Sequence, residues 1–174
     1  AAAAAAFAAA CGTQAATSLS SCEAAVEEAV RGDYVEKDYI MGGGIGAGAF
    51  GTVRRARCRK TGREVAIKII PKTKQTEESI RNECNVLRRA SMHKCIASLE
   101  ALYETETAFF MVMELATGGE LFDKLVDDGP FSEREAALLV QELGGAIALL
   151  HAQGVCHADI KPENLLLTSE GHAK

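Results

Sequence analysis

The sequence predicts an α+β fold with two lobes, and three features support this prediction. Five strand-like segments, rich in β-branched and alternating apolar residues, lie between residues 39 and 115. One amphipathic helical segment separates the third strand from the fourth, and only helical segments and polar loops follow residue 118. Strands and helices that are segregated along the chain in this way are typical of α+β domains.

Length and composition allow one globular domain and exclude several classes of function. The chain has 174 residues, a net charge of −5 and 48% hydrophobic residues, which suffices for one ordinary core. A mildly acidic chain without a dense basic run is a poor nucleic-acid binder, because such binding rests on phosphate neutralisation. No uninterrupted apolar run approaches the roughly 20 residues of a membrane span, so we expect no span.

The cysteines and histidines show no metal-binding pattern. The six cysteines are scattered, and neither C-x-x-C nor H-E-x-x-H occurs. The acidic Asp127-Asp128-Gly129 lacks the alternating ligands of an EF-hand loop. His151 and His157 have no ligand partners, and we interpret both as structural. Scattered cysteines in a chain of this length indicate reduced thiols and therefore an intracellular, cytoplasmic protein.

Residues 1–38 are predicted to form a low-complexity tail. Residues 1–21 are dominated by Ala, Ser and Thr, which bury too little apolar surface to fold, so we expect disorder there. Ser20 and Glu23 have the spacing of a capping box, and Gly32 would end a short helix. A transit peptide is a weaker alternative because the stretch lacks the arginines of such peptides. The first residue is Ala, which suggests a fragment, a processed product or an incomplete gene model.

A glycine-rich segment opens the predicted domain. Its sequence is Ile45-Gly46-Ala47-Gly48-Ala49-Phe50-Gly51-Thr52-Val53, which contains G-x-G-x-x-G. The segment leads into a strand and not a helix, which disfavours a dinucleotide-binding fold, and Thr52 stands where a Walker A loop requires Lys. Because glycines let backbone N–H groups approach phosphate oxygens, we predict a phosphate-covering loop with Phe50 at its tip. A glycine-rich hairpin turn is the plain alternative.

A lysine within an apolar strand marks the next candidate site. Lys68 lies in the middle of Val65-Ala66-Ile67-Lys68-Ile69-Ile70, and a buried lysine is costly unless an ionic partner compensates it. One interpretation is an edge strand with Lys68 in water, and the other places Lys68 in a cleft with a carboxylate. The helix predicted over residues 77–90 supplies Glu83 as that carboxylate, beside an apolar stripe. The stripe consists of Ile80, Cys84, Leu87 and Ala90.

Two further strands and two helices complete the predicted elements. The strands cover residues 96–104 and 108–115. A helix is predicted to open at Glu120. An ordinary acidic residue in the first turn of a helix explains Glu120 nearly as well as a role in binding does. A second helix begins after the capping box of Ser132 and Glu135 and runs to about residue 151. Apolar residues occur around most of this second helix, which predicts that it is largely buried.

The loop after that helix carries three polar side chains of different chemistry. Its sequence is His157-Ala158-Asp159-Ile160-Lys161-Pro162-Glu163-Asn164, and the proline excludes it from a helix interior. Asp159 could take a proton from a hydroxyl, Lys161 could neutralise a phosphate, and Asn164 could bind a divalent cation through its amide oxygen. A polar turn before the strand-like Leu165-Leu166-Leu167 is the plain alternative.

In this order, the motifs resemble those of the catalytic domain of eukaryotic-type serine/threonine protein kinases. Residues 157–164 are similar to H-R-D-x-K-x-x-N, residues 65–68 to V-A-I-K, and residues 118–123 to the G-G-E-L-F-D of the calcium/calmodulin-dependent and calcium-dependent branch. The resemblance covers 39–174 and implies a protein-kinase-like two-lobed fold. A five-stranded antiparallel N-lobe with a helix C would span about 39–115, and the first helices of a truncated C-lobe about 118–174. Ala158 replaces the family's Arg, which implies an activation that depends less on phosphorylation of the activation loop.

The resemblance also implies ATP and Mg²⁺ as cofactors and a role for each matched residue. The implied catalytic residues are Asp159, Lys161, Lys68 and Glu83, and the implied metal ligand is Asn164. Asp159 would orient and deprotonate the hydroxyl, and Lys68, oriented by Glu83, would bind the phosphates. Residue 113 would be the gatekeeper and 114–116 the hinge. The implied ATP-binding residues are Ile45, Gly46, Ala47, Gly48, Ala49, Phe50, Gly51, Val53, Ala66, Lys68, Met113, Glu114, Ala116, Glu120 and Leu166.

The implied function is ATP-dependent phosphorylation of serine and threonine hydroxyls on proteins. Glu120 and Glu163 suggest substrates with basic residues before the target site, since carboxylates pair well with arginine. The family's D-F-G does not occur in these 174 residues, so we expect the isolated chain to be inactive. A non-catalytic nucleotide-binding or scaffolding module is the main alternative, and an unrelated α+β domain with chance motifs is a weaker one. The sequence predicts no oligomeric state.

Overall fold

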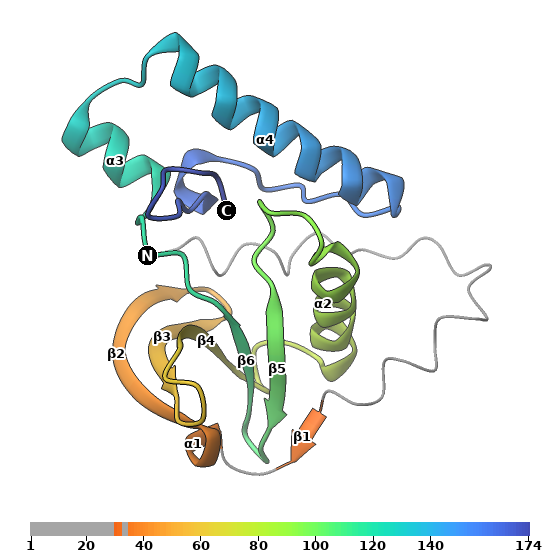
Figure 1. Ribbon diagram of the computed structural model, residues 1–174. Helices are drawn as coiled ribbons and strands as arrows, with labels where there is room; N and C mark the ends of the chain where they lie inside the picture. The colour runs from red at the N-terminus through yellow and green to blue at the C-terminus, as the bar shows by residue number, and fades with distance from the viewer. Residues whose placement is uncertain (1–29, 33–34) are drawn as a thin grey trace.

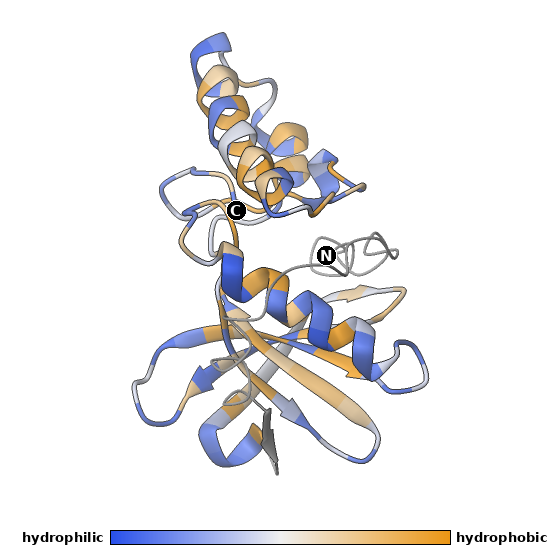
Figure 2. Cartoon of the chain, turned by 90° about the vertical axis from the view of Figure 1, so that its right-hand side faces the viewer, coloured by the Kyte–Doolittle hydropathy of each residue, from blue (hydrophilic) through white to orange (hydrophobic). Residues whose placement is uncertain are grey.

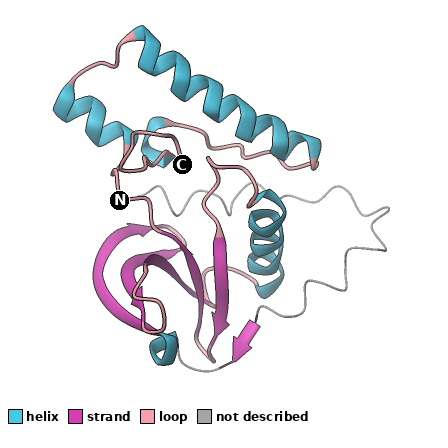
Figure 3. Cartoon of the chain, in the orientation of Figure 1, coloured by secondary structure: helices cyan, strands magenta, loops and turns pink. Residues whose placement is uncertain are grey.

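The computed structural model describes residues 30–32 and 35–174, which form two layers (Figure 1). One layer is a β-sheet with helix α2 beside it, and the other contains helices α3 and α4 and the C-terminal loops (Figure 3). Residues 115–120 connect the last strand to α3 and so join the two layers. Ser20 and Glu23, the predicted capping box, lie outside the described residues.

The sheet contains the five predicted antiparallel strands and one more. Its strands lie in the order β1-β5-β6-β4-β3-β2. The strands are β1 (Val30–Gly32), β2 (Tyr39–Gly48), β3 (Gly51–Cys58), β4 (Glu64–Pro71), β5 (Leu99–Glu104) and β6 (Ala108–Glu114). Strands β2 to β6 pair antiparallel, as predicted, whereas β1 pairs parallel to the outer edge of β5. The sheet therefore confirms the predicted α+β plan, with a short sixth strand at one edge.

Ordered structure begins before Tyr39, where the sequence predicted a tail through residue 38. Strand β1 occupies 30–32 in place of the predicted helix end at Gly32, and a short helix, α1 (Val35–Asp38), follows. Val35 is 1% exposed and packs in the core with Tyr39 and Tyr103. The Tyr103 hydroxyl donates to Asp38 Oδ2 at 2.6 Å. The sequence pattern missed this element because one buried valine among polar residues has no periodicity.

The sheet is buried on both faces, which explains the continuous apolar run of β4. Along β6, Phe109, Met111 and Met113 belong to the core cluster beneath α2, whereas Val112 belongs to the cluster on the opposite face. Successive side chains of a strand point to opposite faces, so β6 contributes to both cores. Strand β4 lies between β3 and β6 and is thus central. The edge-strand interpretation of residues 65–70 is therefore wrong.

Helix α2 (Glu77–Ala90) has the predicted bounds and the predicted buried stripe. Thr76 caps it, since Ser79 N donates to Thr76 Oγ1 at 3.2 Å. Ile80, Cys84, Leu87 and Ala90 are all buried in one core cluster. Glu83 is 5% exposed, so α2 delivers a carboxylate into the protein interior.

The second layer is built from α3 (Leu121–Asp128), α4 (Glu133–Ala152) and a short 3₁₀ helix, Pro162–Asn164. The predicted capping box at the start of α4 is present. Glu135 N donates to Ser132 Oγ at 3.3 Å, and Ser132 N donates to Glu135 Oε2 at 2.9 Å. This reciprocal pair explains why the helix begins where the sequence predicted.

The prediction that α4 is largely buried is wrong. Leu139, Ala146 and Leu150 are buried, but Leu138 is 53% and Val140 68% exposed. Figure 2 shows hydrophobic residues on the upper helices, and they are not confined to one side.

By length and mean hydropathy, α4 is also long and apolar enough to cross a membrane, which the count of uninterrupted apolar residues did not reveal. A helix with few charged residues reaches the required mean even though Gln141 and Glu142 interrupt the apolar run.

Candidate active site

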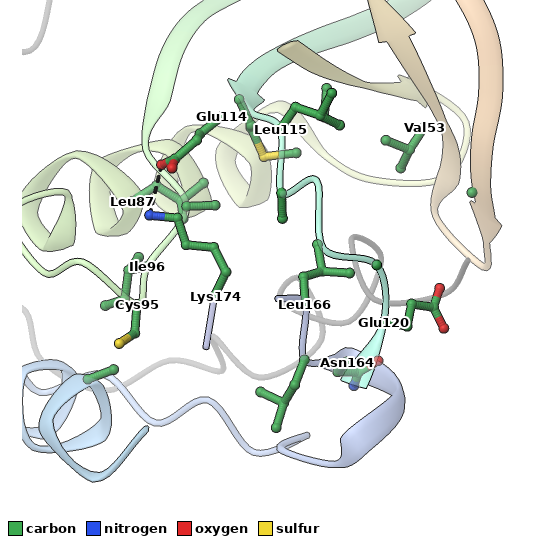
Figure 4. Close-up of a pocket in the computed structure, with 18 of the residues that line it drawn as sticks. Val53, Leu87, Cys95, Ile96, Glu114, Leu115, Glu120, Asn164, Leu166 and Lys174 are labelled. Carbon is green, nitrogen blue, oxygen red and sulfur yellow. Dashed lines mark ion pairs between the residues drawn. The ribbon is translucent and has the colours of Figure 1, made fainter. Parts of the chain in front are cut away.

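A cavity of about 560 Å³ lies between the sheet and the second layer (Figure 4). Strands β2, β3, β4 and β6 line one side of it, and residues 164–166 and 174 line the other. Several residues predicted for nucleotide or metal binding line this cavity together. They are Ile45, Gly46, Val53, Ala66, Met113, Glu114, Ala116, Glu120, Asn164 and Leu166.

Other predicted site residues do not line this cavity. They are Ala47, Gly48, Ala49, Phe50, Gly51, Lys68, Asp159 and Lys161. The loop residues Ala49 and Phe50 form the turn between β2 and β3, where Gly48 pairs with Gly51. The hairpin interpretation and the phosphate-loop interpretation are therefore compatible, because the glycine segment is the tip of an antiparallel hairpin.

Gly51 has a steric role that the motif did not reveal. A Cβ on Gly51 would lie 2.0 Å from the backbone oxygen of Ile69 in β4. No side chain fits there without moving the strand, so glycine allows β3 to start close against β4. At Gly44, in the same hairpin, an added Cβ would meet nothing within 4 Å.

Lys68 and Glu83 form a buried ion pair. The distance from Lys68 Nζ to Glu83 Oε1 is 2.8 Å, and the two residues are 1% and 5% exposed. This is the pairing predicted for a lysine in a central apolar strand, since an unpaired charge there would be very costly. Within the described residues, Lys68 Nζ has no other acceptor, and buried Glu83 Oε2 has no hydrogen-bond partner. Two N–H groups of Lys68 therefore have no acceptor among the described residues.

The loop 157–164 organises its polar side chains around Asp159. Asn164 Nδ2 donates to Asp159 Oδ2 at 2.7 Å and to its backbone oxygen at 2.8 Å. Lys161 Nζ lies 3.2 Å from Asp159 Oδ1. Hydrogen bonds from Lys161 and Asn164 hold the pKa of the Asp159 carboxyl below its usual range, so it is ionised at neutral pH. The sequence-predicted acid, base and amide thus form one connected cluster.

The two residues before Asp159 have unusual environments. Ala158 has φ of 56°, the left-handed region that costs a residue with a Cβ roughly 1–2 kcal/mol. The His157 ring accepts a hydrogen bond from Asp159 N at 3.4 Å, and burial lowers the pKa of its imidazole. A neutral His157 that supports the loop backbone agrees with the structural role expected from the sequence.

Two contacts of the cavity were not anticipated from the sequence. The backbone of Leu165–Leu167 pairs with the linker, where Gly118 N donates to Leu167 O at 2.8 Å and Leu121 N to Leu165 O at 2.9 Å. Lys174 Nζ lies 2.9 Å from Glu114 Oε2, across the lobes. The apolar run 165–167 indicated a strand, but no local pattern indicates which distant segment it contacts.

Residues 39–174 match the family model described as protein kinase domain. The chain belongs to the protein kinase family. This assignment confirms the resemblance to serine/threonine kinase catalytic domains and the kinase-like α+β fold. The region that matches the kinase family begins at Tyr39, so β1 and α1 lie before it.

Relatives of this kinase chain include several serine/threonine kinases. A probable myosin light chain kinase of Dictyostelium discoideum is 42% identical over 133 residues, which are 76% of this chain and 43% of that protein. The serine/threonine-protein kinase PEPKR2 of Arabidopsis thaliana is 41% identical over 141 residues, 81% of this chain and 29% of that protein. A calcium/calmodulin-dependent protein kinase type 1 of Macrobrachium nipponense is 44% identical over 138 residues, 78% of this chain and 40% of that protein. The chain spans less than half the length of each relative.

Protein kinases use ATP and Mg²⁺, and the residues of this kinase chain fit both. Apolar Val53 and Ala66 line the cavity from the sheet and Leu166 lines it from the second layer, which suits a flat heterocycle. Lys68 does not line the cavity, but its Nζ has N–H groups that no described residue accepts. Asn164 uses its Nδ2 on Asp159, and no described residue bonds its Oδ1, an oxygen type that Mg²⁺ accepts.

Proposed function

We propose that this chain supplies the nucleotide-binding and phosphoryl-transfer centre of a kinase that phosphorylates serine and threonine hydroxyls of proteins, using ATP and Mg²⁺. The observation that carries the proposal is the buried Lys68–Glu83 pair at 2.8 Å, inside a family whose relatives are serine/threonine kinases. A buried lysine that keeps free donors has little structural justification unless an anion uses them.

The proposed roles follow from the geometry of the chain's own groups. Asp159 is held ionised and in place by Lys161 and Asn164, so it can orient a hydroxyl and accept its proton. Lys161 adds positive charge beside the reacting oxygens, and Lys68 binds phosphate oxygens from the sheet side. ATP, when bound, supplies the transferred phosphoryl group, whose charge Mg²⁺ neutralises with Asn164 as one ligand.

The proposed substrates are proteins with basic residues before the target site. Glu163 Oε2 is buried and has no hydrogen-bond partner in the part of the chain that the structure describes. We propose that this carboxylate turns toward an arginine of the substrate, because a buried oxygen without a partner gains from such a pairing. Glu120 lines the cavity at the start of α3 and adds a second carboxylate.

Two further proposals concern regulation and location. Ala158 cannot pair with a phosphorylated activation loop as an arginine would, so we expect the activity to depend little on such phosphorylation.

The free cysteines Cys58, Cys84, Cys95 and Cys156 suit a reducing, intracellular compartment.

Two variants test the proposed function in a longer protein that contains this chain. Asp159→Asn should keep ATP affinity and lower the rate of phosphoryl transfer about a hundredfold or more, because the proton acceptor is lost. Lys68→Met should weaken ATP binding as well. The readouts are calorimetric ATP titration and phosphate incorporation into a basic peptide with Ser or Thr. Transfer that survives both substitutions would refute the proposed roles.

The same assay distinguishes the proposed kinase function from the main alternative. A non-catalytic nucleotide-binding or scaffolding module would bind ATP without transfer even in the longer protein. For a polypeptide of these 174 residues alone we expect no transfer, because D-F-G, whose Asp holds Mg²⁺ in this family, does not occur in it. Measurable transfer by that polypeptide would contradict this part of the proposal.

A further inference from the structure

Lys174 contacts the sheet from the opposite side of the cavity, and the proposed function does not use it. Its Nζ lies 2.9 Å from Oε2 of Glu114, the last residue of β6, and its side chain is 9% exposed. Both residues line the cavity, and Figure 4 shows the ion pair spanning from the C-terminal segment to the end of β6. The Glu114 side chain is 38% exposed, so the pair is sheltered from solvent on the lysine side only.

The backbone of Lys174 is tied to the residue that forms the floor of the cavity. Lys174 N donates to Leu166 O at 2.8 Å, and Leu166 N donates to Lys174 O at 3.0 Å. Leu166 lines the cavity opposite Val53 and Ala66. Any displacement of Lys174 therefore moves Leu166, and with it the width of the space for a flat ligand.

The floor is attached to the rest of the molecule on two sides. On one side, the linker holds it through the hydrogen bonds of Gly118 and Leu121 to Leu167 and Leu165. That linker is also the covalent connection between the layers. On the other side, Lys174 links the floor directly to β6 through Glu114. The ion pair is therefore one of several contacts between the two layers, and it is the one that reaches from the floor to the end of β6.

Neighbouring groups hold both partners of this pair in place. Lys174 Nζ also donates to the backbone oxygen of Lys94 at 2.6 Å, and Lys94 Nζ pairs with Glu142 of α4 at 2.6 Å. Glu142 Oε2 in turn accepts from Ala173 N at 3.0 Å. On the other side, Ser98 Oγ donates to Glu114 Oε2 at 3.3 Å. A pair that is already ordered loses less side-chain entropy than a mobile surface pair.

We propose that Lys174 is a positioning residue for nucleotide binding: its ion pair with Glu114 sets the distance between Leu166 and the sheet. This inference rests on the proposed function, because it concerns the same cavity. Lys174 itself does not need to touch the nucleotide. Its loss should lower affinity by releasing the floor and should leave the cavity residues chemically intact.

A double-mutant cycle tests the proposal with ATP as the probe. Lys174→Met and Glu114→Gln are each expected to weaken ATP affinity about fivefold, and the double variant should be no weaker than either single one. Glu114→Gln keeps the hydrogen bonds with Ser98 while removing the charge. Lys174→Arg keeps the charge and should bind within about twofold of the parent. Affinity is measured by calorimetry at a temperature where circular dichroism shows each variant folded.

Lys72→Met is the matched control, because it removes an ion pair of 2.6 Å with Glu104 at the opposite end of the β5–β6 pair. Its ATP affinity should stay within about twofold of the parent. Additive losses in the double variant, or unchanged affinity in both single variants, would overturn the positioning role. If Lys174→Met does not fold, the ATP affinities of Glu114→Gln and Lys174→Arg test the positioning role instead. A parent that binds no ATP would refute the proposed function, whereas a parent that binds with unaffected variants refutes only this inference.

Discussion

The Lys68–Glu83 pair illustrates how one residue's environment depends on distant segments. Lys68 pairs in register with Val53 of β3 and Met111 of β6, and it is 1% exposed. Glu83 reaches it from α2. Removing one partner of such a pair costs about 3–5 kcal/mol, because the other charge remains buried. Stability and the proposed phosphate binding therefore depend on the same two side chains.

Gly51 is expected to tolerate no side chain. Gly51→Ala places a Cβ 2.0 Å from Ile69 O, so β3 must shift away from β4 and unfolding free energy should fall by about 2 kcal/mol or more. Gly44→Ala is the control, since nothing lies within 4 Å of its Cβ, and it should change stability by less than about 0.5 kcal/mol. Urea denaturation measures both, and equal effects would contradict the steric argument.

Protonation of Glu142 should lower the free energy of unfolding as the pH falls. Burial raises the pKa of its carboxyl, but hydrogen bonds from Lys94, Ala173 N and His172 lower it more, from 4.5 to about 2. The native state therefore binds fewer protons than the unfolded state between these values. The resulting stabilisation, on the order of 2 kcal/mol, is complete above about pH 5 and is lost as the pH falls toward 2. Unfolding free energy measured from pH 6 to 3 should decline less steeply for Glu142→Gln than for the parent.

At the scale of elements, α1 shows that the folded unit extends beyond the matched family region. Val35 lies in the same core cluster as Tyr39 and Tyr103, and Arg59 N donates to Asp38 O at 2.8 Å. These contacts close the end of the sheet where β2 begins. The element thus contributes packing that the kinase motifs, which start at Tyr39, do not include.

Val35→Ala should destabilise the fold by about 2 kcal/mol, because it leaves a cavity in a well-packed core. Glu36→Ala, one residue further along the same helix and exposed, is the control and should have little effect. Thermal unfolding followed by circular dichroism compares the two variants. A Val35→Ala protein as stable as the control would show that α1 is not part of the folded core.

For the whole molecule, the second layer leaves apolar surface uncovered in these residues. Leu138→Glu with Val140→Glu should lower the fluorescence of the hydrophobic dye ANS and change unfolding free energy by less than about 1 kcal/mol, because both side chains are exposed. Leu139→Glu is the contrasting control, since Leu139 is 8% exposed and a carboxylate there should unfold the layer. Unchanged dye binding in the double variant would contradict the exposed face of α4.

The two layers are joined by a short linker and also by core packing, because Ala146 and Leu150 of α4 belong to the same cluster as Met113 of β6. The proposed site residues come from both layers, with Lys68 and Glu83 from the sheet side and Asp159 and Asn164 from the other. Neither layer holds a complete set. The Glu114–Lys174 pair is the kind of contact that limits how far the layers separate.

The sequence by itself determined the elements whose information is local. The periodicity of α2, the capping box at Ser132 and the apolar run of β6 all depend on residues a few positions apart, and these predictions were confirmed. The order of the motifs also determined the family. Local patterns of this kind reflect backbone propensity and side-chain spacing, which act before any long-range contact forms.

Only the tertiary structure decided what depends on contacts between distant residues. It placed β4 in the centre of the sheet, buried Val35, exposed one face of α4 and brought Lys174 to Glu114. The same apolar pattern on α4 is compatible with burial on all sides or on one, because periodicity records which residues are apolar and not which neighbours cover them. Burial, ion pairing and the width of the cavity follow from packing, so no local stretch of sequence contains them.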